Sequence, residues 1–171
     1  SDFIEKILNK VFKKYNVKKD LEITLELNPD DFSRDYLTKI KVIGVNRISL
    51  GVQSFDKFDM KLLNRNHSPT QSIKALDCIS NLYDNFSIDL IYGIPYSSME
   101  KWKNNLKIAL KYESPHLSCY SLTLEPNTAL HYKVNSGDIK LLDEKLVKKQ
   151  YNYLVEKLEE KGYRNYEFSS F

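Results

Sequence analysis

The chain has 171 residues, of which 42% are hydrophobic, and this is enough for one sizeable hydrophobic core. Its 26 basic and 23 acidic residues are interspersed and leave a formal net charge of +3, which argues against binding to nucleic acid or membranes through overall charge. Cys78 and Cys119 lack the spacing of a metal motif, and no apolar run is long enough to span a bilayer. These features predict a cytoplasmic protein with no transmembrane segment.

The first part of the chain predicts a helix, a strand and a second helix. Apolar residues at helical spacing predict a helix over residues 3–15. Alternating apolar and polar residues predict a strand over residues 21–27, closed by a turn at residues 28–31. This strand places Glu26 on its polar face, near its carboxyl end. Ser33 then caps a helix that Gly44 ends.

Residues 47–56 form the pattern around which the rest of the chain is organised. Ile48, Leu50 and Val52 share one face, which we expect to pack under helices, and the opposite face carries Arg47, Ser49, Gly51 and Gln53. Gln53 comes at the carboxyl end of this strand. Parallel sheets keep their chemistry at that end.

Two further strand and helix units follow. A short helix around Met60 leads through a polar link to a helix with a capping box at Ser68, and residues 86–93 form a strand whose polar face carries Asp89. A second capping box at residues 97–100 predicts the next helix. A fourth strand is expected over residues 117–124, with Thr123 on the face of Cys119 and Ser121.

The end of the chain predicts a helix over residues 141–161 and one more strand within residues 163–171. The order indicates an α/β fold with about four parallel strands and outer helices. A closed barrel of eight such units takes about 250 residues. We therefore expect residues 1–171 to be a single fragment of a (β/α) barrel domain, open because the first strands are missing.

The parity of the strands brings Glu26, Gln53, Asp89 and Thr123 to the polar faces of four successive strands, and Arg65 lies in a following loop. Such a cup suits a ligand with hydroxyl, ammonium and carboxylate groups, because arginine donates two parallel hydrogen bonds to a carboxylate. Each residue also has an ordinary structural role. In that case Glu26 pairs with Arg47 or with a lysine inside the sheet, Gln53 is a structural amide, and Arg65 is a solvated charge at a helix end.

Three motifs carry a resemblance to a known family. They are ELNP at residues 26–29, NRISLGVQSF at residues 46–55 and DLIYGIP at residues 89–95. Together with residues 120–128 and 166–171, they resemble the radical SAM proteins related to oxygen-independent coproporphyrinogen III oxidase, and most of all the HemW-type haem chaperones. The oxidase branch usually has an aspartate where Ser54 stands.

The resemblance implies a radical SAM barrel whose cup holds S-adenosylmethionine. Glu26, Gln53, Arg65 and Asp89 match cofactor-contacting positions, and Thr123 matches a position whose backbone approaches the adenine. The family cleaves this cofactor reductively with a [4Fe-4S] cluster. For the chaperone branch the resemblance implies binding of haem, which is passed to membrane respiratory proteins. For the oxidase branch it implies oxidative decarboxylation of coproporphyrinogen III.

Two family motifs are absent from the sequence. Neither the Cys-x3-Cys-x2-Cys cluster motif nor the glycine-rich motif of the second strand is present. Both would precede Ser1, so we expect a fragment whose cluster ligands lie outside this chain. Alone, it is expected to hold no cluster, to be catalytically inactive and to bind the cofactor weakly at most.

Two other classes of function stay open at this point. A cluster-less metabolite-binding module would use the same cup to hold a small molecule. Nucleic acid binding through the basic face at residues 10–19 is the least favoured and predicts strongly salt-dependent affinity. None of the three histidines, His67, His116 and His131, has metal-ligand spacing, so no haem ligand is predicted.

Overall fold

The computed structural model describes residues 2–31 and 33–171 and contains one parallel sheet with the strand order β1-β2-β3-β4. The strands are β1 (Thr24–Leu27), β2 (Arg47–Gln53), β3 (Phe86–Tyr92) and β4 (His116–Ser121). The helices are α1 (Asp2–Lys14), α2 (Arg34–Val42), α3 (Lys57–Leu62), α4 (Pro69–Leu82), α5 (Met99–Ala109), α6 (Ala129–Asn135) and α7 (Glu144–Glu159), with a 3₁₀ turn, η1 (Leu110–Tyr112), after α5. This is the predicted α/β arrangement with four parallel strands.

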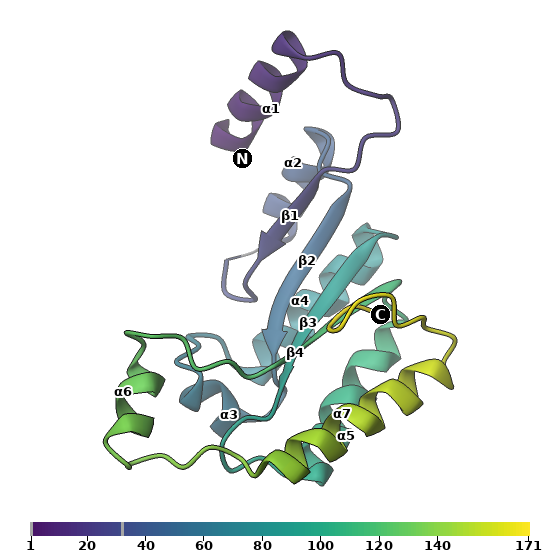
Figure 1. Cartoon of the computed structure of the whole chain (residues 1–171). Helices are drawn as coiled ribbons and strands as arrows, with labels where there is room; N and C mark the ends of the chain where they lie inside the picture. Colours follow the sequence, from purple (N-terminus) through teal and green to yellow (C-terminus); the bar gives the residue numbers. More distant parts are fainter. Residues whose placement is uncertain (1, 32) are drawn as a thin grey trace.

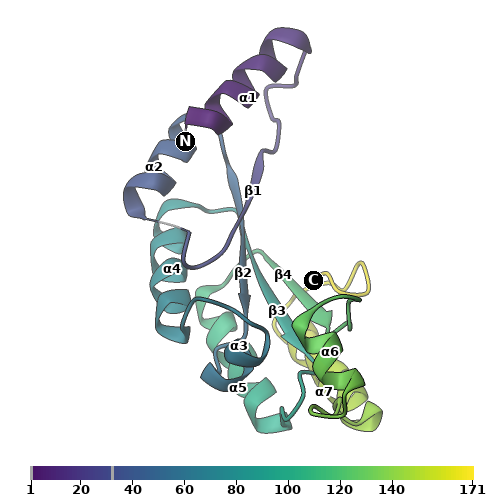
Figure 2. The ribbon, with the colours of Figure 1, turned by 90° about the vertical axis from the view of Figure 1, so that its left-hand side faces the viewer.

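One face of the sheet carries the hydrophobic core. Ile48, Leu50, Ile88 and Leu90 are fully buried, and Figure 2 shows α2 and α4 along one side of the sheet. The strand arrows in Figure 1 point toward α3 and α6, so the carboxyl ends of the strands lie next to these two helices. The alternation of β2 therefore separates a packed apolar face from a polar face, as the sequence predicts.

The sheet has two edges, and they differ. β1 forms one edge, and it is shorter than the predicted strand because the Asn46 side chain accepts from Ile23 N (2.7 Å) and donates to Leu21 O (2.8 Å). At the other edge the C-terminal segment pairs with β4 through one isolated antiparallel bridge, between Ser118 and Ser170, in place of the further strand expected there. Leu117 and Phe171 exchange two backbone hydrogen bonds of 3.0 Å, and this covers the edge of β4.

Local signals set most helix boundaries. Ser33 caps α2, and the capping box between Ser68 and Gln71 opens α4, both as predicted. The capping box predicted at residues 97–100 is wrong. Ser97 N donates to Ile94 O in a turn, and Ser98 caps α5 one residue later, by accepting from Lys101 N.

Three other features differ from what the sequence predicts. α6 was not predicted, and α7 is shorter than residues 141–161. β4 ends at Ser121 because its neighbour β3 ends at Tyr92 and the chain then turns at Gly93, which has a φ of +78°.

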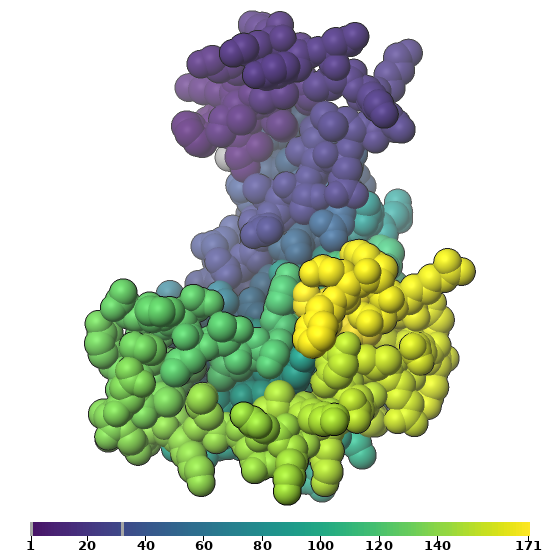
Figure 3. Space-filling view, viewed as in Figure 1, coloured from purple at the N-terminus to yellow at the C-terminus, as the bar shows by residue number. Residues whose placement is uncertain are grey.

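In Figure 3 the green segment around α6 and the yellow C-terminal segment form separate bulges on one face. None of the described helices has the length and apolar character needed to cross a membrane.

Candidate functional site

The polar face of the sheet is centred on Asp89. Its two carboxylate oxygens each lie 3.1 Å from Ser49 Oγ, and Ser87 Oγ donates to one of them at 3.4 Å. Burial raises the pKa of this carboxyl, while hydrogen bonds from Ser118 and the other serines act in the opposite direction. Three hydroxyl groups thus partner an aspartate that is largely withdrawn from water.

Glu26 lies on the same face, one strand further. It is paired with Ser49 in the sheet register, and its charge contributes to raising the pKa of Asp89. Among the described residues Glu26 forms no ion pair, and Arg47 donates to Thr24 Oγ1 instead (3.4 Å). The ordinary alternative of a Glu26–Arg47 pair is therefore not what the structure contains. The Glu26 side chain is exposed and is free to meet a ligand.

Gln53 ends β2 in an unusual conformation. Its φ is +67°, and Ser54 N donates to Val52 O (2.9 Å), which closes a three-residue turn around it. The register between β2 and β3 shifts at this point, between Leu50 and Gln53. A non-glycine residue with positive φ is strained, and such strain clusters at functional sites. The turn ends the alternation of the strand.

Gly51 makes room for the Gln53 amide. A Cβ at Gly51 would lie 2.9 Å from Gln53 Nε2 and 3.5 Å from Asn28 Oδ1. Asn28 Oδ1 in turn accepts a hydrogen bond from Arg65 Nη1 (3.1 Å). The carboxyl ends of β1 and β2 and the loop after α3 therefore meet at Asn28, which ties Arg65 to the edge of the sheet. Asn28 belongs to the ELNP motif, but the sequence pattern does not predict it as a site residue.

Arg65 and Thr123 line the same cavity, which has a volume of about 560 Å³. Its other walls come from the end of α3 and from α6, at the end of the sheet where the β-strands terminate (Figure 1). A cavity of this size is typical of small-molecule sites. Arg65 comes from the loop after α3 and Thr123 from the loop after β4, so the fold brings these two residues together. Glu26, Gln53 and Asp89 are not among the described residues that line this cavity.

The predicted position of Thr123 on a strand is wrong. Thr123 lies in the loop after β4, and the register pairs Asp89 with Ser118 and Leu90 with Cys119. Cys119 is fully buried, so the polar face of β4 carries Ser118. The sequence missed Ser118 because the register of two neighbouring strands cannot be counted from one strand alone. The parity of β3 and β4 is the signal that could have found it.

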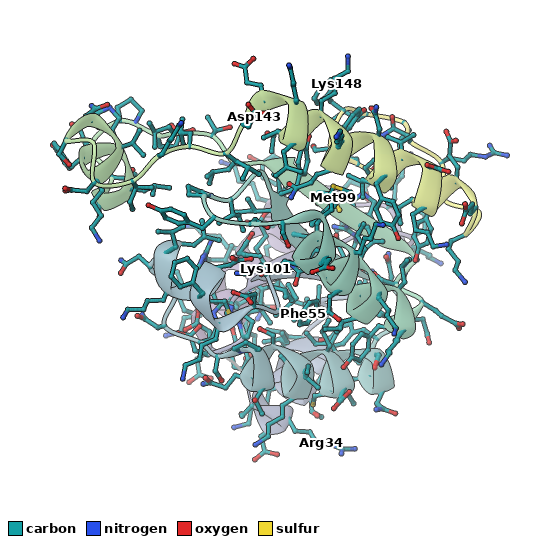
Figure 4. The ribbon with its side chains drawn as sticks, turned by 90° about the horizontal axis from the view of Figure 1, so that it is seen from below. Arg34, Phe55, Met99, Lys101, Asp143 and Lys148 are labelled. Carbon is teal, nitrogen blue, oxygen red and sulfur yellow. The ribbon has the colours of Figure 1, made fainter. Side chains whose placement is uncertain are left out.

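A buried polar cluster supports the turn at Gln53. Ser54 Oγ donates to Asp59 Oδ2 (2.9 Å) and accepts from Asn105 Nδ2 (3.0 Å). Lys101 Nζ reaches Asp56 (3.1 Å) and Asp59 (3.4 Å). Lys101, labelled in Figure 4, belongs to α5 and so connects this helix to the start of α3. These bonds fix the backbone directly after Gln53 to two helices.

The cysteines are separate and chemically different. Cys119 is buried in β4, where burial raises the pKa of its thiol, and Cys78 is half-buried on α4. Within residues 2–31 and 33–171, no group of three or more His, Cys, Asp or Glu side chains is arranged to hold a metal ion. The described residues therefore offer no set of ligands for an iron–sulfur cluster.

Comparison with known proteins decides the family. The model of the radical SAM superfamily matches residues 1–109, which is more than half of the chain. The chain belongs to the radical SAM superfamily. Its structure resembles that of Escherichia coli coproporphyrinogen III oxidase HemN, described as a radical SAM enzyme, with a TM-score of 0.83 over 98% of this chain and 39% of that one. The sequence identity in that comparison is 24%, so this similarity shows only that the two folds are alike.

Curated relatives point in the same direction. The heme chaperone HemW of Buchnera aphidicola from Schizaphis graminum is 33% identical over 171 residues, covering 100% of this chain and 44% of the relative. A mouse mitochondrial protein, radical S-adenosyl methionine domain-containing protein 1, is 34% identical over 96% of this chain and 38% of its own length. The chain thus spans less than half the length of these relatives. Its parallel sheet is part of a radical SAM barrel.

Proposed function

We infer that this chain forms part of the S-adenosylmethionine site of a HemW-type haem chaperone. The cavity shared by Arg65 and Thr123, at the carboxyl ends of the strands, is the observation that carries this proposal. Its position is the one at which parallel sheets bind ligands. The relatives named heme chaperone HemW supply the haem part of the proposal.

The residues present fit S-adenosylmethionine. Arg65 offers a guanidinium group to the carboxylate of the cofactor, and Asn28 holds that group in place. Glu26 and Asp89 offer carboxylate oxygens to an ammonium group or to ribose hydroxyls, and Gln53 adds an amide. Thr123 lines the cavity, and in this proposal its backbone approaches the adenine. In this superfamily a bound [4Fe-4S] cluster supplies the electron that cleaves the cofactor.

The chain's own contribution is to bind and orient the cofactor. Ser49, Ser87 and Ser118 hold Asp89, so its oxygens have a fixed direction, while burial raises the pKa of its carboxyl. Gln53 is held by its strained turn and by the buried cluster beneath it. Rigid side chains of this kind reduce the entropy lost when a ligand binds.

Ser54 favours the chaperone branch over the oxidase branch. Its hydroxyl donates to the buried carboxylate of Asp59, and the oxidase branch usually carries an aspartate at this position. Two buried carboxylates at hydrogen-bonding distance would repel each other. Ser54 and Asp59 are therefore a matched pair, and we assign the chain to the chaperone branch. Haem would then be handed to membrane respiratory proteins.

The proposal is tested with the full natural chain that carries these residues. After anaerobic cluster reconstitution, haem-loaded protein is mixed with an apo respiratory haem protein in membranes, and coproporphyrinogen III is supplied in a parallel reaction. Haem transfer without release of carbon dioxide supports the chaperone. Release of carbon dioxide from coproporphyrinogen III would assign the protein to the oxidase branch and overturn the proposal.

A further inference from the structure

A second cavity lies away from the candidate cofactor site, between α5 and α7. We call it the α5–α7 groove, and its volume is about 560 Å³. Its floor is apolar and is formed by Leu106, Leu110 and Tyr153. Leu106 is almost completely buried, so the floor lies below the helix surfaces rather than protruding from them.

Lysines form both rims of this groove. Lys103, Lys107 and Lys111 follow one another at intervals of four residues along α5 and η1, which places them on one side. Lys157 and Lys161 have the same spacing on the α7 side. Lys103 Nζ lies 5.1 Å from the centre of the Tyr153 ring and so reaches across the groove.

The positive charge of the groove is largely unbalanced. Among the described residues, Lys103, Lys107, Lys111 and Lys161 form no ion pair. Lys157 pairs with Glu160 (2.6 Å), and Glu100 is the one acidic residue that lines the groove within the described part of the chain. Five lysines around an apolar floor create a potential that attracts an anion with an apolar body.

The shape of the groove restricts the ligand. A membrane surface binds protruding apolar side chains, whereas here Leu106 is buried and Leu110 and Tyr153 are half-buried. The volume is in the range of small-molecule sites, and lysines on both rims suit a ligand with more than one anionic group. The described lining contains no His, Cys or Met, so it offers no axial ligand to an iron atom.

We propose that the α5–α7 groove binds a tetrapyrrole through its carboxylates, with the flat ring on Leu110 and Tyr153 and without coordination of a metal. The choice of a tetrapyrrole rests on the proposed function, because the haem-handling relatives supply that ligand class. The site itself rests on the apolar floor and the unpaired lysines.

The test uses the full chain with metal-free protoporphyrin IX, whose fluorescence reports binding. We expect the free acid to bind and its uncharged dimethyl ester to bind at least about tenfold more weakly. The affinity of the free acid should fall as the salt concentration rises. Lys107→Glu combined with Lys161→Glu should weaken binding by about tenfold. The control, Lys145→Glu with Lys148→Glu, changes net charge equally outside the groove, and Figure 4 shows Lys148 pointing away from α5.

Each outcome decides the proposal. Equal binding of the acid and the ester, or equal loss in both charge-reversal variants, would overturn it. If oleate competes as strongly as protoporphyrin, the ligand of the groove is an amphiphile with a single carboxylate, and the tetrapyrrole proposal is overturned. If the groove variant fails to fold, the comparison of acid and ester on the unmodified chain still decides.

This inference and the proposed function can fail separately. Variants of the groove lysines should leave S-adenosylmethionine binding unchanged, because none of them lines the cavity of Arg65 and Thr123. Porphyrin binding that ignores the groove variants would end this inference and leave haem handling intact. Normal porphyrin binding in the groove, with no S-adenosylmethionine binding at Arg65, would refute the proposed function and leave the inference about the groove intact.

Discussion

Ser54 donates a 2.9 Å hydrogen bond to the carboxylate of Asp59, and both side chains are completely buried. Burial raises the pKa of Asp59, while the Ser54 hydroxyl and the Lys101 charge lower it. A donor at position 54 is thus needed to satisfy a buried acceptor. The same serine accepts from Asn105 and connects β2 to α5. The turn at Gln53 depends on this small polar cluster.

Replacing Ser54 tests this dependence. We expect Ser54→Asp to lower the free energy of unfolding by about 3 kcal/mol more than Ser54→Asn at pH 7, because it adds a second buried carboxylate beside Asp59. Chemical denaturation measures both values. The asparagine variant controls for size, and the gap should narrow as pH falls and the carboxylates become protonated. Equal stability of the two variants at pH 7 would mean that Asp59 does not need a donor there.

Gly51→Ala tests the placement of the Gln53 amide. The new Cβ would lie 2.9 Å from Gln53 Nε2, and the flexible end of that side chain can move away. We expect a change in stability below about 1 kcal/mol and an S-adenosylmethionine affinity that is about tenfold lower. Chemical denaturation measures the change in stability, and NMR titration measures the affinity for S-adenosylmethionine.

A double-mutant cycle identifies the cause of that loss. If Gly51→Ala acts only by displacing Gln53, then combining it with Gln53→Ala should cost no more affinity than Gln53→Ala alone. Additive losses would instead show that the methyl group obstructs the cofactor directly.

Asp89→Asn should separate stability from binding. Because burial raises the pKa of Asp89 above its ordinary value of 3.8, the folded chain holds the proton more tightly than the unfolded chain. Stability is therefore lost as pH rises from 3.8 through the folded pKa. We expect the variant to be more stable than the parent at pH 7, with the difference shrinking as pH falls toward 3.8.

The same variant should bind S-adenosylmethionine about tenfold more weakly, because a charged acceptor is lost. Denaturation at several pH values and a cofactor titration are the measurements. A variant that is less stable at pH 7 and equally stable at low pH would contradict the account of Asp89.

Arg65→Lys tests whether the planar guanidinium matters. Arg65 Nη1 is committed to Asn28, and the remaining donors can meet a carboxylate in parallel. Lysine keeps the charge and loses this geometry, so affinity for S-adenosylmethionine should fall by about tenfold. Lys61→Arg, at the wall of the same cavity, is a control that should bind normally. An unchanged affinity for S-adenosylmethionine in Arg65→Lys would show that Arg65 contributes only its positive charge and not the planar geometry of its guanidinium group.

Much of this fold follows from the sequence, because period-two alternation and capping residues act locally. The cap at Ser33 and the capping box at Ser68 are as predicted, β2 ends at Gln53 as expected, and β3 is one residue shorter than the predicted strand. β1 is shorter because the side chain of Asn46 takes over its backbone hydrogen bonds, which is a tertiary effect. The face of Thr123 could not be predicted, since it depends on where β3 ends.

The candidate site also has some features that the sequence predicts and others that arise only from tertiary contacts. Glu26 and Asp89 stand on the predicted polar face, because strand parity fixes their direction. The strained turn of Gln53 and the contact between Asn28 and Arg65 arise from three segments that meet only in the folded chain. Strand parity places Ser49 and Ser118 on polar faces, but the register that brings them to Asp89 is set only in the folded sheet.

The central claim is that the carboxyl ends of the strands bind S-adenosylmethionine. NMR titration of the ¹⁵N-labelled chain with this cofactor tests it most directly, because shifts of backbone amides detect even weak binding. The account predicts saturable shifts at Glu26, Asn28, Gln53, Asp89 and Thr123, and their loss in Arg65→Ala. Shifts confined to other regions, or shifts at these amides that survive Arg65→Ala, would contradict it.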